Sequence, residues 1–172
     1  MPSYTAPVAD TMFVLNEIVG LDRLANTPGF AAASSDIVAA VLEEGGKFAG
    51  EVLNPLNPVG DEIGCKRNDD GTVSVPPGFQ EAFDQFVAGG WTTLHAPEEF
   101  GGQALPMVLA IAVEEYFTSA NHAFNMYHGL TGAAVSAILA KGSEELQKKY
   151  VPNMVAGTWC GTMNLTEPHA GT

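Results

Sequence analysis

The fold is decided by residues 106–155, which have the sequence PMVLAIAVEEYFTSANHAFNMYHGLTGAAVSAILAKGSEELQKKYVPNMV. Apolar residues recur in this stretch at helical spacing, and a few local signals divide it. Pro106 suits the first turn of a helix, where its missing N–H costs little. Asn121 is expected to cap a second helix, and Ser143 a third, whose far end Pro152 should interrupt. The stretch therefore predicts three consecutive helices.

Helix patterns also fill most of the preceding sequence. Asp10 is expected to cap a first helix that stops at Gly20, and a second helix should follow over residues 34–52. The glycine pair at 45–46 weakens that second helix, so it indicates either a close neighbouring helix or a kink. A short helix is predicted over residues 79–87. Five or six helices joined by loops predict an all-α, bundle-like domain.

Residues 54–77 interrupt the helical pattern. This stretch is rich in Pro, Gly, Asn and Asp, which favour turns and loops. Residues 68–71, Asn-Asp-Asp-Gly, form a turn signal, and the alternation at 72–75 is typical of a short strand. We therefore expect a long surface excursion that carries a small hairpin.

The pattern changes again after Gly157. Residues 159–172, WCGTMNLTEPHAGT, have the texture of an extended run entering a polar turn. A strand needs partners for its backbone N–H and C=O groups, and no later residues are present to supply them. We expect residues 1–157 to form a helical domain and residues 158–172 to begin a second domain of a longer polypeptide.

Charge and composition exclude several classes of partner. The chain has 172 residues and a formal net charge of −13, with 20 acidic against 7 basic residues. Such a surface repels nucleic-acid backbones and anionic lipid, so neither is expected as a partner. No apolar stretch of membrane-spanning length and no secretory or mitochondrial leader is evident, which predicts a cytoplasmic protein. Cys65 and Cys160 are expected to be reduced thiols that are buried or inert, in place of a disulfide.

Metal, hydrolytic and phosphate-loop chemistry lack support in the sequence. His122 and His128 are six residues apart, which does not give the shared helix face of an i,i+4 ligand pair, and no Cys or carboxylate cluster completes a metal site. No G-x-S-x-G motif supports a serine hydrolase, and no glycine-rich phosphate loop is present. No metal site is therefore predicted.

Two motifs resemble those of a known enzyme family. Residues 163–172, MNLTEPHAGT, are similar to the TEPxAGS/T signature of flavin-dependent acyl-CoA dehydrogenases, and residues 97–102, PEEFGG, resemble the PEEFGG/PEEYGG turn of the same family. Both occur in the family order. The opening residues, MPSYTAP, look most like the long subfamily that includes 3-methylmercaptopropionyl-CoA dehydrogenase. The resemblance implies an N-terminal helical domain that runs into the first strand of a middle β-barrel domain, with a C-terminal helical domain to follow.

The resemblance also implies a cofactor site and a substrate site. The residues that match the family's flavin-contacting strand are Met163, Leu165 and Thr166, so they would bind FAD. Met163 replaces an aromatic residue that is common in the family. Gly171 and Thr172 would contact the thioester end of an acyl-CoA substrate. A strand-to-turn corner can supply backbone N–H groups, a hydroxyl and a dry surface, although an ordinary loop corner has the same pattern.

The implied reaction is oxidation of an acyl-CoA at its Cα–Cβ bond. A carboxylate removes the α-proton, the β-hydride passes to the flavin, and an electron-transferring flavoprotein accepts the electrons. The family's catalytic Glu would lie beyond Thr172, so no catalytic residue is predicted here, and Glu98 and Glu99 are interpreted as turn residues. We expect the parent enzyme to be a homo-oligomer, and the isolated chain to be inactive and to hold FAD weakly or not at all.

Several alternatives remain open from the sequence. The chain could be a non-catalytic helical interaction module derived from the family, or part of an acyl-CoA oxidase, a flavoprotein monooxygenase or a nitroalkane oxidase. The bulky cluster Phe124, Met126 and Tyr127 could be helix core or could line an acyl pocket. The acidic chain would not attract the phosphates of coenzyme A, so a basic patch for them is expected elsewhere.

Overall fold

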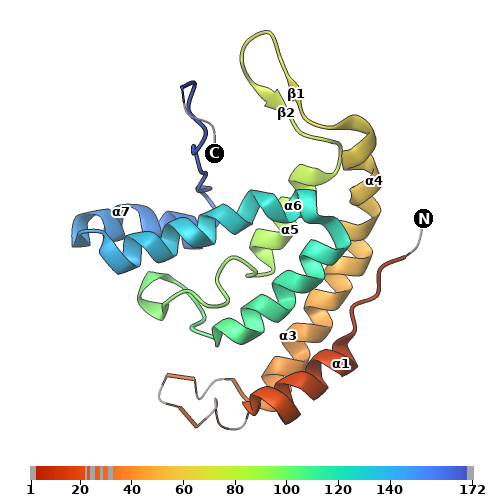
Figure 1. Cartoon of the computed structure of the whole chain (residues 1–172), viewed down its shortest axis with the longest axis vertical. Helices are drawn as coiled ribbons and strands as arrows, with labels where there is room; N and C mark the ends of the chain where they lie inside the picture. The colour runs from red at the N-terminus through yellow and green to blue at the C-terminus, as the bar shows by residue number, and fades with distance from the viewer. Residues whose placement is uncertain (1–2, 22, 24–25, 28, 31–32, 170–172) are drawn as a thin grey trace.

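The computed structural model describes residues 3–21, 23, 26–27, 29–30 and 33–169. Helices dominate these residues, as predicted, and the strands form one short antiparallel hairpin (Figure 1). The elements are α1 (Val8–Phe13), the π-helical η1 (Val14–Val19), α3 (Ser35–Phe48), the π-helical η2 (Ala49–Leu53), α4 (Asn54–Ile63), β1 (Lys66–Arg67), β2 (Val73–Ser74), α5 (Phe79–Ala88), the 3-10 turn η3 (Glu98–Phe100), α6 (Met107–Lys141) and α7 (Glu144–Val155). The predicted all-α class is confirmed, and no helix in these described ranges is long and apolar enough to cross a membrane.

Helix α6 is bent sharply at Asn121, which has the non-helical angles φ −158° and ψ 89°. We call residues 107–120 the first arm and residues 122–141 the second arm; Figure 1 shows them diverging from this vertex. The Asn121 side chain caps the second arm, because its Oδ1 accepts a hydrogen bond from Phe124 N at 3.0 Å. Its Nδ2 donates to the Leu53 carbonyl at 3.1 Å. The cap predicted from the sequence is confirmed, and it also joins α6 to η2.

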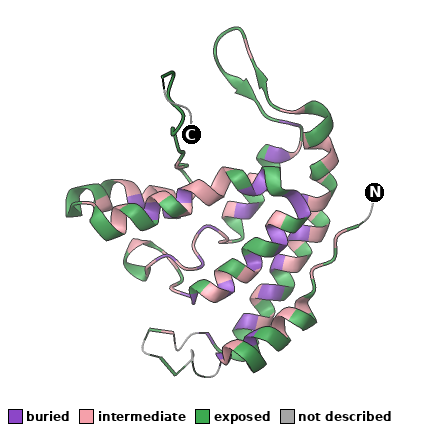
Figure 2. Cartoon of the chain, viewed as in Figure 1, coloured by how far each residue is buried: buried purple, intermediate pink, exposed green. Residues whose placement is uncertain are grey.

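The core lies where α3, α5 and the first arm of α6 pack together (Figure 2). Its buried side chains are mostly Leu, Val and Phe, and aromatic rings gather around Phe86 and Phe117. The glycine pair of α3 allows close approach. A Cβ on Gly45 would lie 3.3 Å from Val113 of α6, and one on Gly46 would lie 2.9 Å from Ala6. Of the two explanations offered by the sequence, close packing is therefore the one observed.

The predicted surface excursion over residues 54–77 is wrong in its first half. Residues 54–63 form helix α4, which continues from α3 through η2. Pro55 falls in the first turn, where a missing N–H is tolerated. Gly60 allows the ring of Phe79 to approach the helix closely, because a Cβ at position 60 would lie 2.8 Å from that ring. Tertiary packing thus outweighs the low helix propensity of Pro and Gly. The predicted hairpin does form, in β1 and β2.

The N-terminal helix begins before its predicted cap. Helix α1 starts at Val8 after Pro7, so Asp10 lies inside the first turn and does not cap it. The following residues wind as the π-helix η1, whose i→i+5 hydrogen bonds widen the turn. Gly20 ends η1 in the left-handed region with φ 78°, as expected. Tyr4 to Val8 lie along α3 and η2, in a groove beside Gly46 and Gly50.

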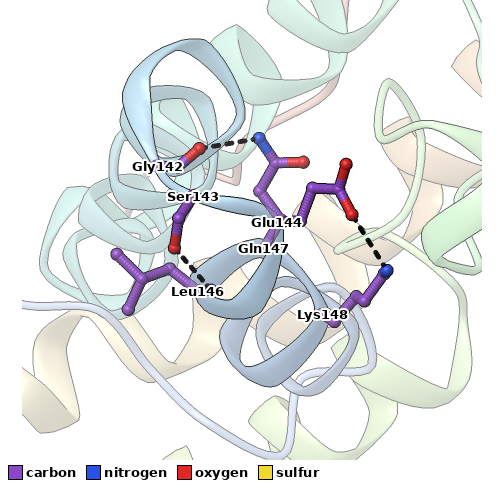
Figure 3. A network of polar contacts seen from close by, with 6 residues as sticks. All are labelled: Gly142, Ser143, Glu144, Leu146, Gln147 and Lys148. Atoms are coloured by element: carbon purple, nitrogen blue, oxygen red, sulfur yellow. Dashed lines mark hydrogen bonds and ion pairs between the residues drawn. The ribbon is translucent and has the colours of Figure 1, made fainter.

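Helix α7 is joined to α6 by a tight corner (Figure 3). The Ser143 Oγ accepts a hydrogen bond from Leu146 N at 3.3 Å, which confirms the predicted cap. Gln147 Nε2 donates to the Gly142 carbonyl at 3.1 Å. Pro152 does not interrupt the helix where expected, because α7 continues to Val155. The exposed ion pair between Lys148 and Glu144 adds little stability.

Residues 160–166 differ from the sequence prediction, since they have no regular secondary structure. A strand is stable only when a neighbour pairs with its backbone. Within the described residues the only sheet is the β1–β2 hairpin, which does not include this segment. The segment follows α7 in the chain, contacts the second arm of α6 at Gly161 and projects from the helical body (Figure 1).

Candidate functional site

A cavity of about 220 Å³ lies between the two arms of α6. The first arm contributes Met107 and Glu114, and α5 contributes Phe86. The second arm presents one face to it, made largely of small and polar residues at helical spacing: Asn125, His128, Gly129, Gly132, Ala133 and Ser136. This cavity was not predicted from the sequence, although small residues at i, i+3 and i+4 are a signal of close approach.

His128 is one of the titratable groups that line this cavity. Its ring lies 5.2 Å from the ring of Phe86, measured between centroids. Burial, together with the nearby His95, lowers the pKa of His128 to about 4. His128 is therefore neutral near pH 7 and can offer one nitrogen as a donor and the other as an acceptor. Asn125 is oriented by its Nδ2, which donates to Thr118 Oγ1 on the first arm at 2.9 Å.

The opposite face of the second arm contacts the C-terminal segment. Gly161 N donates to Thr131 Oγ1 at 2.9 Å, and a Cβ on Gly161 would lie 3.0 Å from Ala134. This face of the second arm carries residues 127, 130, 131 and 134, whereas the residues that line the 220 Å³ cavity lie on the opposite face. The second arm thus separates the 220 Å³ cavity from the segment that carries the predicted flavin residues.

A second, more apolar pocket of about 190 Å³ lies on the segment's side of the arm. Phe79, Phe83, Tyr127 and Cys160 line it. Cys65 Sγ lies 3.6 Å from the Tyr127 hydroxyl. Burial is the main cause that raises the pKa of Tyr127 to about 12, and Cys65 adds to it. Both thiols are free and exposed.

The predicted cluster on the second arm divides between core and surface. Phe124 is core, whereas Met126 is exposed, and Tyr127 alone of the three lines the 190 Å³ pocket.

The residues predicted to bind FAD lie on the projecting segment. Met163 and Leu165 are 59% and 55% exposed, and Thr166 is also exposed. Gly171 and Thr172, the predicted substrate residues, lie outside the described residues. The structure therefore places the three FAD candidates on one exposed segment, anchored at Gly161.

The PEEFGG turn is built by its glycines. Gly101 has φ 87°, which favours glycine, and a Cβ on Gly102 would overlap the carbonyl oxygen of Ala96. Glu98 and Glu99 are exposed in η3 and do not converge. Among the residues that the structure describes, no group of three or more metal-ligating side chains is present.

Comparison with known proteins places these features in a family. The family model "Acyl-CoA dehydrogenase, N-terminal domain" matches residues 39–158, well over half of the chain. The chain is 38% identical to 3-methylmercaptopropionyl-CoA dehydrogenase of Ruegeria pomeroyi, over 99% of the chain and 29% of that relative. It is 29% identical to a butyryl-CoA dehydrogenase of Syntrophomonas wolfei (99% of the chain, 28% of the relative). It is 31% identical to the broad-specificity linear acyl-CoA dehydrogenase FadE5 of Mycobacterium tuberculosis (100% and 28%).

The relatives fall into a longer and a shorter group. The chain spans less than a third of the relatives that match it from end to end, since 170 aligned residues are only 29% of the first. Other relatives match only about half of the chain. In one of them 93 aligned residues make up 24% of the protein, and in two others 95 aligned residues make up 22%. The relatives that align over the whole chain are therefore longer, by enough for a whole domain.

These comparisons settle the family. The domain model covers the helices from α3 to α7, and the 38% identity extends along nearly the whole chain. On these two matches, the chain belongs to the acyl-CoA dehydrogenase family and carries its N-terminal domain.

Proposed function

We propose that the full-length protein is an FAD-dependent acyl-CoA dehydrogenase that oxidises the Cα–Cβ bond of an acyl-CoA thioester. The observation that carries the proposal is the 38% identity, over 99% of the chain, to 3-methylmercaptopropionyl-CoA dehydrogenase. That similarity extends through the N-terminal residues outside the family model, so 3-methylmercaptopropionyl-CoA is the first candidate substrate. The proposed protein is a cytoplasmic homo-oligomer that passes electrons to an electron-transferring flavoprotein.

The residues of the projecting segment fit a flavin in chemical type. Met163 and Leu165 present exposed apolar side chains that can cover one face of an aromatic ring system. Thr166 carries a hydroxyl that can donate to a ring heteroatom, and the hydrogen bond from Gly161 N to Thr131 fixes the start of the segment. FAD, when bound, supplies the hydride acceptor for the oxidation. We propose that these three residues position it and exclude water.

The substrate side of the proposal uses the end of the same segment. Gly171 and Thr172 would contact the thioester, following the family motif that they match. Tyr127 is proposed to contact the acyl group, because it lines an apolar pocket together with Cys160, three residues before Met163. The catalytic base is proposed to lie in the part of the protein beyond these residues.

The test uses the full-length protein, purified and examined anaerobically. Addition of 3-methylmercaptopropionyl-CoA should bleach the flavin absorbance, and an electron-transferring flavoprotein should restore it. Butyryl-CoA is the comparison substrate, and Tyr127→Ala should change the ratio of kcat/KM between the two acyl groups. Absence of bound flavin, or absence of bleaching with any acyl-CoA, would exclude the dehydrogenase. Reoxidation by molecular oxygen in place of the flavoprotein would indicate an oxidase.

The 172-residue chain provides a matched comparison. Its three candidate FAD residues are largely exposed, and the proposed base is not among its residues. We expect it neither to retain flavin nor to oxidise acyl-CoA. Stoichiometric flavin after gel filtration of this chain would contradict that expectation.

A further inference from the structure

The side chain of Thr131 holds the start of the C-terminal segment against the second arm of α6. Thr131 is only 2% exposed, and its Oγ1 accepts the hydrogen bond from Gly161 N at 2.9 Å. A polar group that is buried away from water needs a partner, so both groups depend on this bond. Because the two residues are 30 positions apart in the chain, the bond fixes where the segment lies along the arm.

The glycine makes this position specific to one residue of the segment. A Cβ at position 161 would lie 3.0 Å from Ala134 Cβ, 3.1 Å from Thr131 Cα and 3.2 Å from the Leu130 carbonyl oxygen. The last two atoms belong to the backbone of the helix and cannot move aside as a flexible side chain can. The residues before and after the glycine, a cysteine and a threonine, both carry a Cβ. A shift of the segment by one residue would therefore force a side chain into this close contact.

Helix α7 holds the residues that precede this contact. Thr158 Oγ1 donates to the Asn153 carbonyl at 3.0 Å, and the ring centroids of Trp159 and Tyr150 lie 5.9 Å apart. The chain is thus attached to α7 first and to the second arm directly afterwards. Met163, the first of the FAD candidates, follows this second attachment by two residues.

The register of the segment decides which of its side chains can face a flavin. Successive side chains of an extended chain point to opposite faces, so Met163 and Leu165 would share one face and Thr166 would lie on the other. A slip of one residue exchanges the two faces. A site that covers a ring with the apolar pair and uses the hydroxyl separately therefore needs a fixed register.

We propose that Thr131 is a positioning residue for FAD and that, together with Gly161, it sets the register in which Met163 and Leu165 face the flavin. The proposal rests on the binding of FAD by these residues, as proposed above. Thr131 acts through the backbone of Gly161 and does not itself touch the cofactor. The competing role is purely structural, in which Thr131 stabilises the helical domain and leaves the flavin unaffected.

The experiment compares FAD binding among variants of the full-length protein. Thr131→Val keeps the size of the side chain and removes the acceptor, whereas Thr131→Ser keeps the hydroxyl. Thr92→Val is the matched control, because Thr92 is also buried and its hydroxyl donates to the Val155 carbonyl of α7 at 2.8 Å. The flavin is removed and titrated back, which gives the Kd of FAD and the absorbance spectrum of the bound flavin.

We expect Thr131→Val to raise the Kd of FAD about three- to tenfold, as the loss of one hydrogen bond implies, and to shift the flavin spectrum. Thr131→Ser should restore both properties, and Thr92→Val should change neither. Gly161→Ala should also raise the Kd. Because both substitutions act on one contact, their effects on the Kd should not add in the double variant.

Hydrogen exchange gives a readout that does not depend on the flavin. The Gly161 amide should exchange faster in Thr131→Val than in wild type, and Thr131→Ser should restore its protection. Unchanged exchange at Gly161 would overturn the proposal. So would a Kd of FAD for Thr131→Val within about twofold of wild type, or an equal rise in Thr92→Val.

These results separate this proposal from the proposed function. If the wild-type protein binds FAD and acyl-CoA bleaches it, an unchanged Kd in Thr131→Val rejects the positioning role alone. If the full-length wild type binds no FAD, the proposed function is rejected, and the positioning role is rejected with it.

Discussion

Replacing Asn121 should destabilise the helical domain more than any other single polar substitution in α6. The side chain is 1% exposed and makes two hydrogen bonds at the vertex. One caps the second arm through Phe124 N at 3.0 Å, and the other satisfies the Leu53 carbonyl at 3.1 Å. Asn121→Ala removes both. The cap belongs to the second arm of α6 and the Leu53 carbonyl belongs to η2, so a variant that keeps one of the two hydrogen bonds separates the two losses.

The magnitude follows from the two contacts. Loss of a helix N-cap costs about 1 kcal/mol, and loss of one hydrogen bond to a carbonyl that keeps its helical partner costs about 0.5–1.5 kcal/mol. Asn121→Ala should therefore lower the free energy of unfolding by about 1.5–2.5 kcal/mol. Asn121→Ser keeps a capping oxygen but cannot reach the Leu53 carbonyl as a donor, so it should recover about 1 kcal/mol of that loss. Asn121→Asp keeps the cap but sets a carboxylate against that carbonyl, which raises the pKa of the carboxyl group.

Urea unfolding followed by circular dichroism measures these differences, provided that the slope with denaturant is unchanged. His122→Ala is the control, because His122 is the adjacent exposed residue and should change stability by less than about 0.5 kcal/mol. The Asp variant should gain stability relative to wild type as the pH falls and its carboxyl group protonates. An Asn121→Ala variant within about 0.5 kcal/mol of the His122 control would refute the reasoning.

Two further predictions concern pH and the PEEFGG turn. Because the pKa of His128 in the folded protein, about 4, lies below its unfolded value, the unfolded state binds the proton first. The free energy of unfolding should fall by up to about 3 kcal/mol between pH 6.5 and 4. His128→Gln should flatten the dependence of the free energy of unfolding on pH, and His122→Gln should leave this dependence unchanged. Equal slopes in both variants would contradict the assignment of the pH dependence to His128. In the turn, Gly102→Ala should destabilise by more than about 3 kcal/mol, because its Cβ would overlap the Ala96 carbonyl. Gly101→Ala meets no atom within 4 Å and should cost only about 1–2 kcal/mol for its φ of 87°; thermal unfolding that ranks the two variants in the opposite order would disprove this.

Local signals predicted two of the three proposed helix caps. Asn121 and Ser143 each accept a hydrogen bond from the backbone N–H three residues later, as predicted, whereas Asp10 does not cap α1. Ser34 caps α3 in the same way. These caps depend on side chains within one turn, so the sequence contains the whole interaction. The hairpin was predictable for the same reason, since Asn68 N bonds to the Thr72 carbonyl at 2.8 Å across its turn.

Features that depend on distant residues could not be predicted in the same way. Helix α4 was not predicted because the tolerance for its two prolines and its glycine comes from packing, above all from Phe79 against Gly60. The 220 Å³ cavity needs the angle that Asn121 sets, and that angle depends on the Leu53 carbonyl, 68 positions earlier. The FAD residues Met163, Leu165 and Thr166 stay a prediction, because their partners would come from outside the described residues.

The two opposed faces of the second arm bear on which insertions the domain can tolerate. One residue inserted between Asn121 and Asn125 would rotate everything beyond it by about 100°. The side chains that now line the cavity would then move toward the C-terminal segment, and Thr131 would leave Gly161. An insertion of about seven residues, close to two full turns, would restore both faces and lengthen the arm by about 10 Å. Length changes in this arm should therefore be tolerated only in steps of whole turns, whereas the hairpin tip between β1 and β2 carries no such phase constraint.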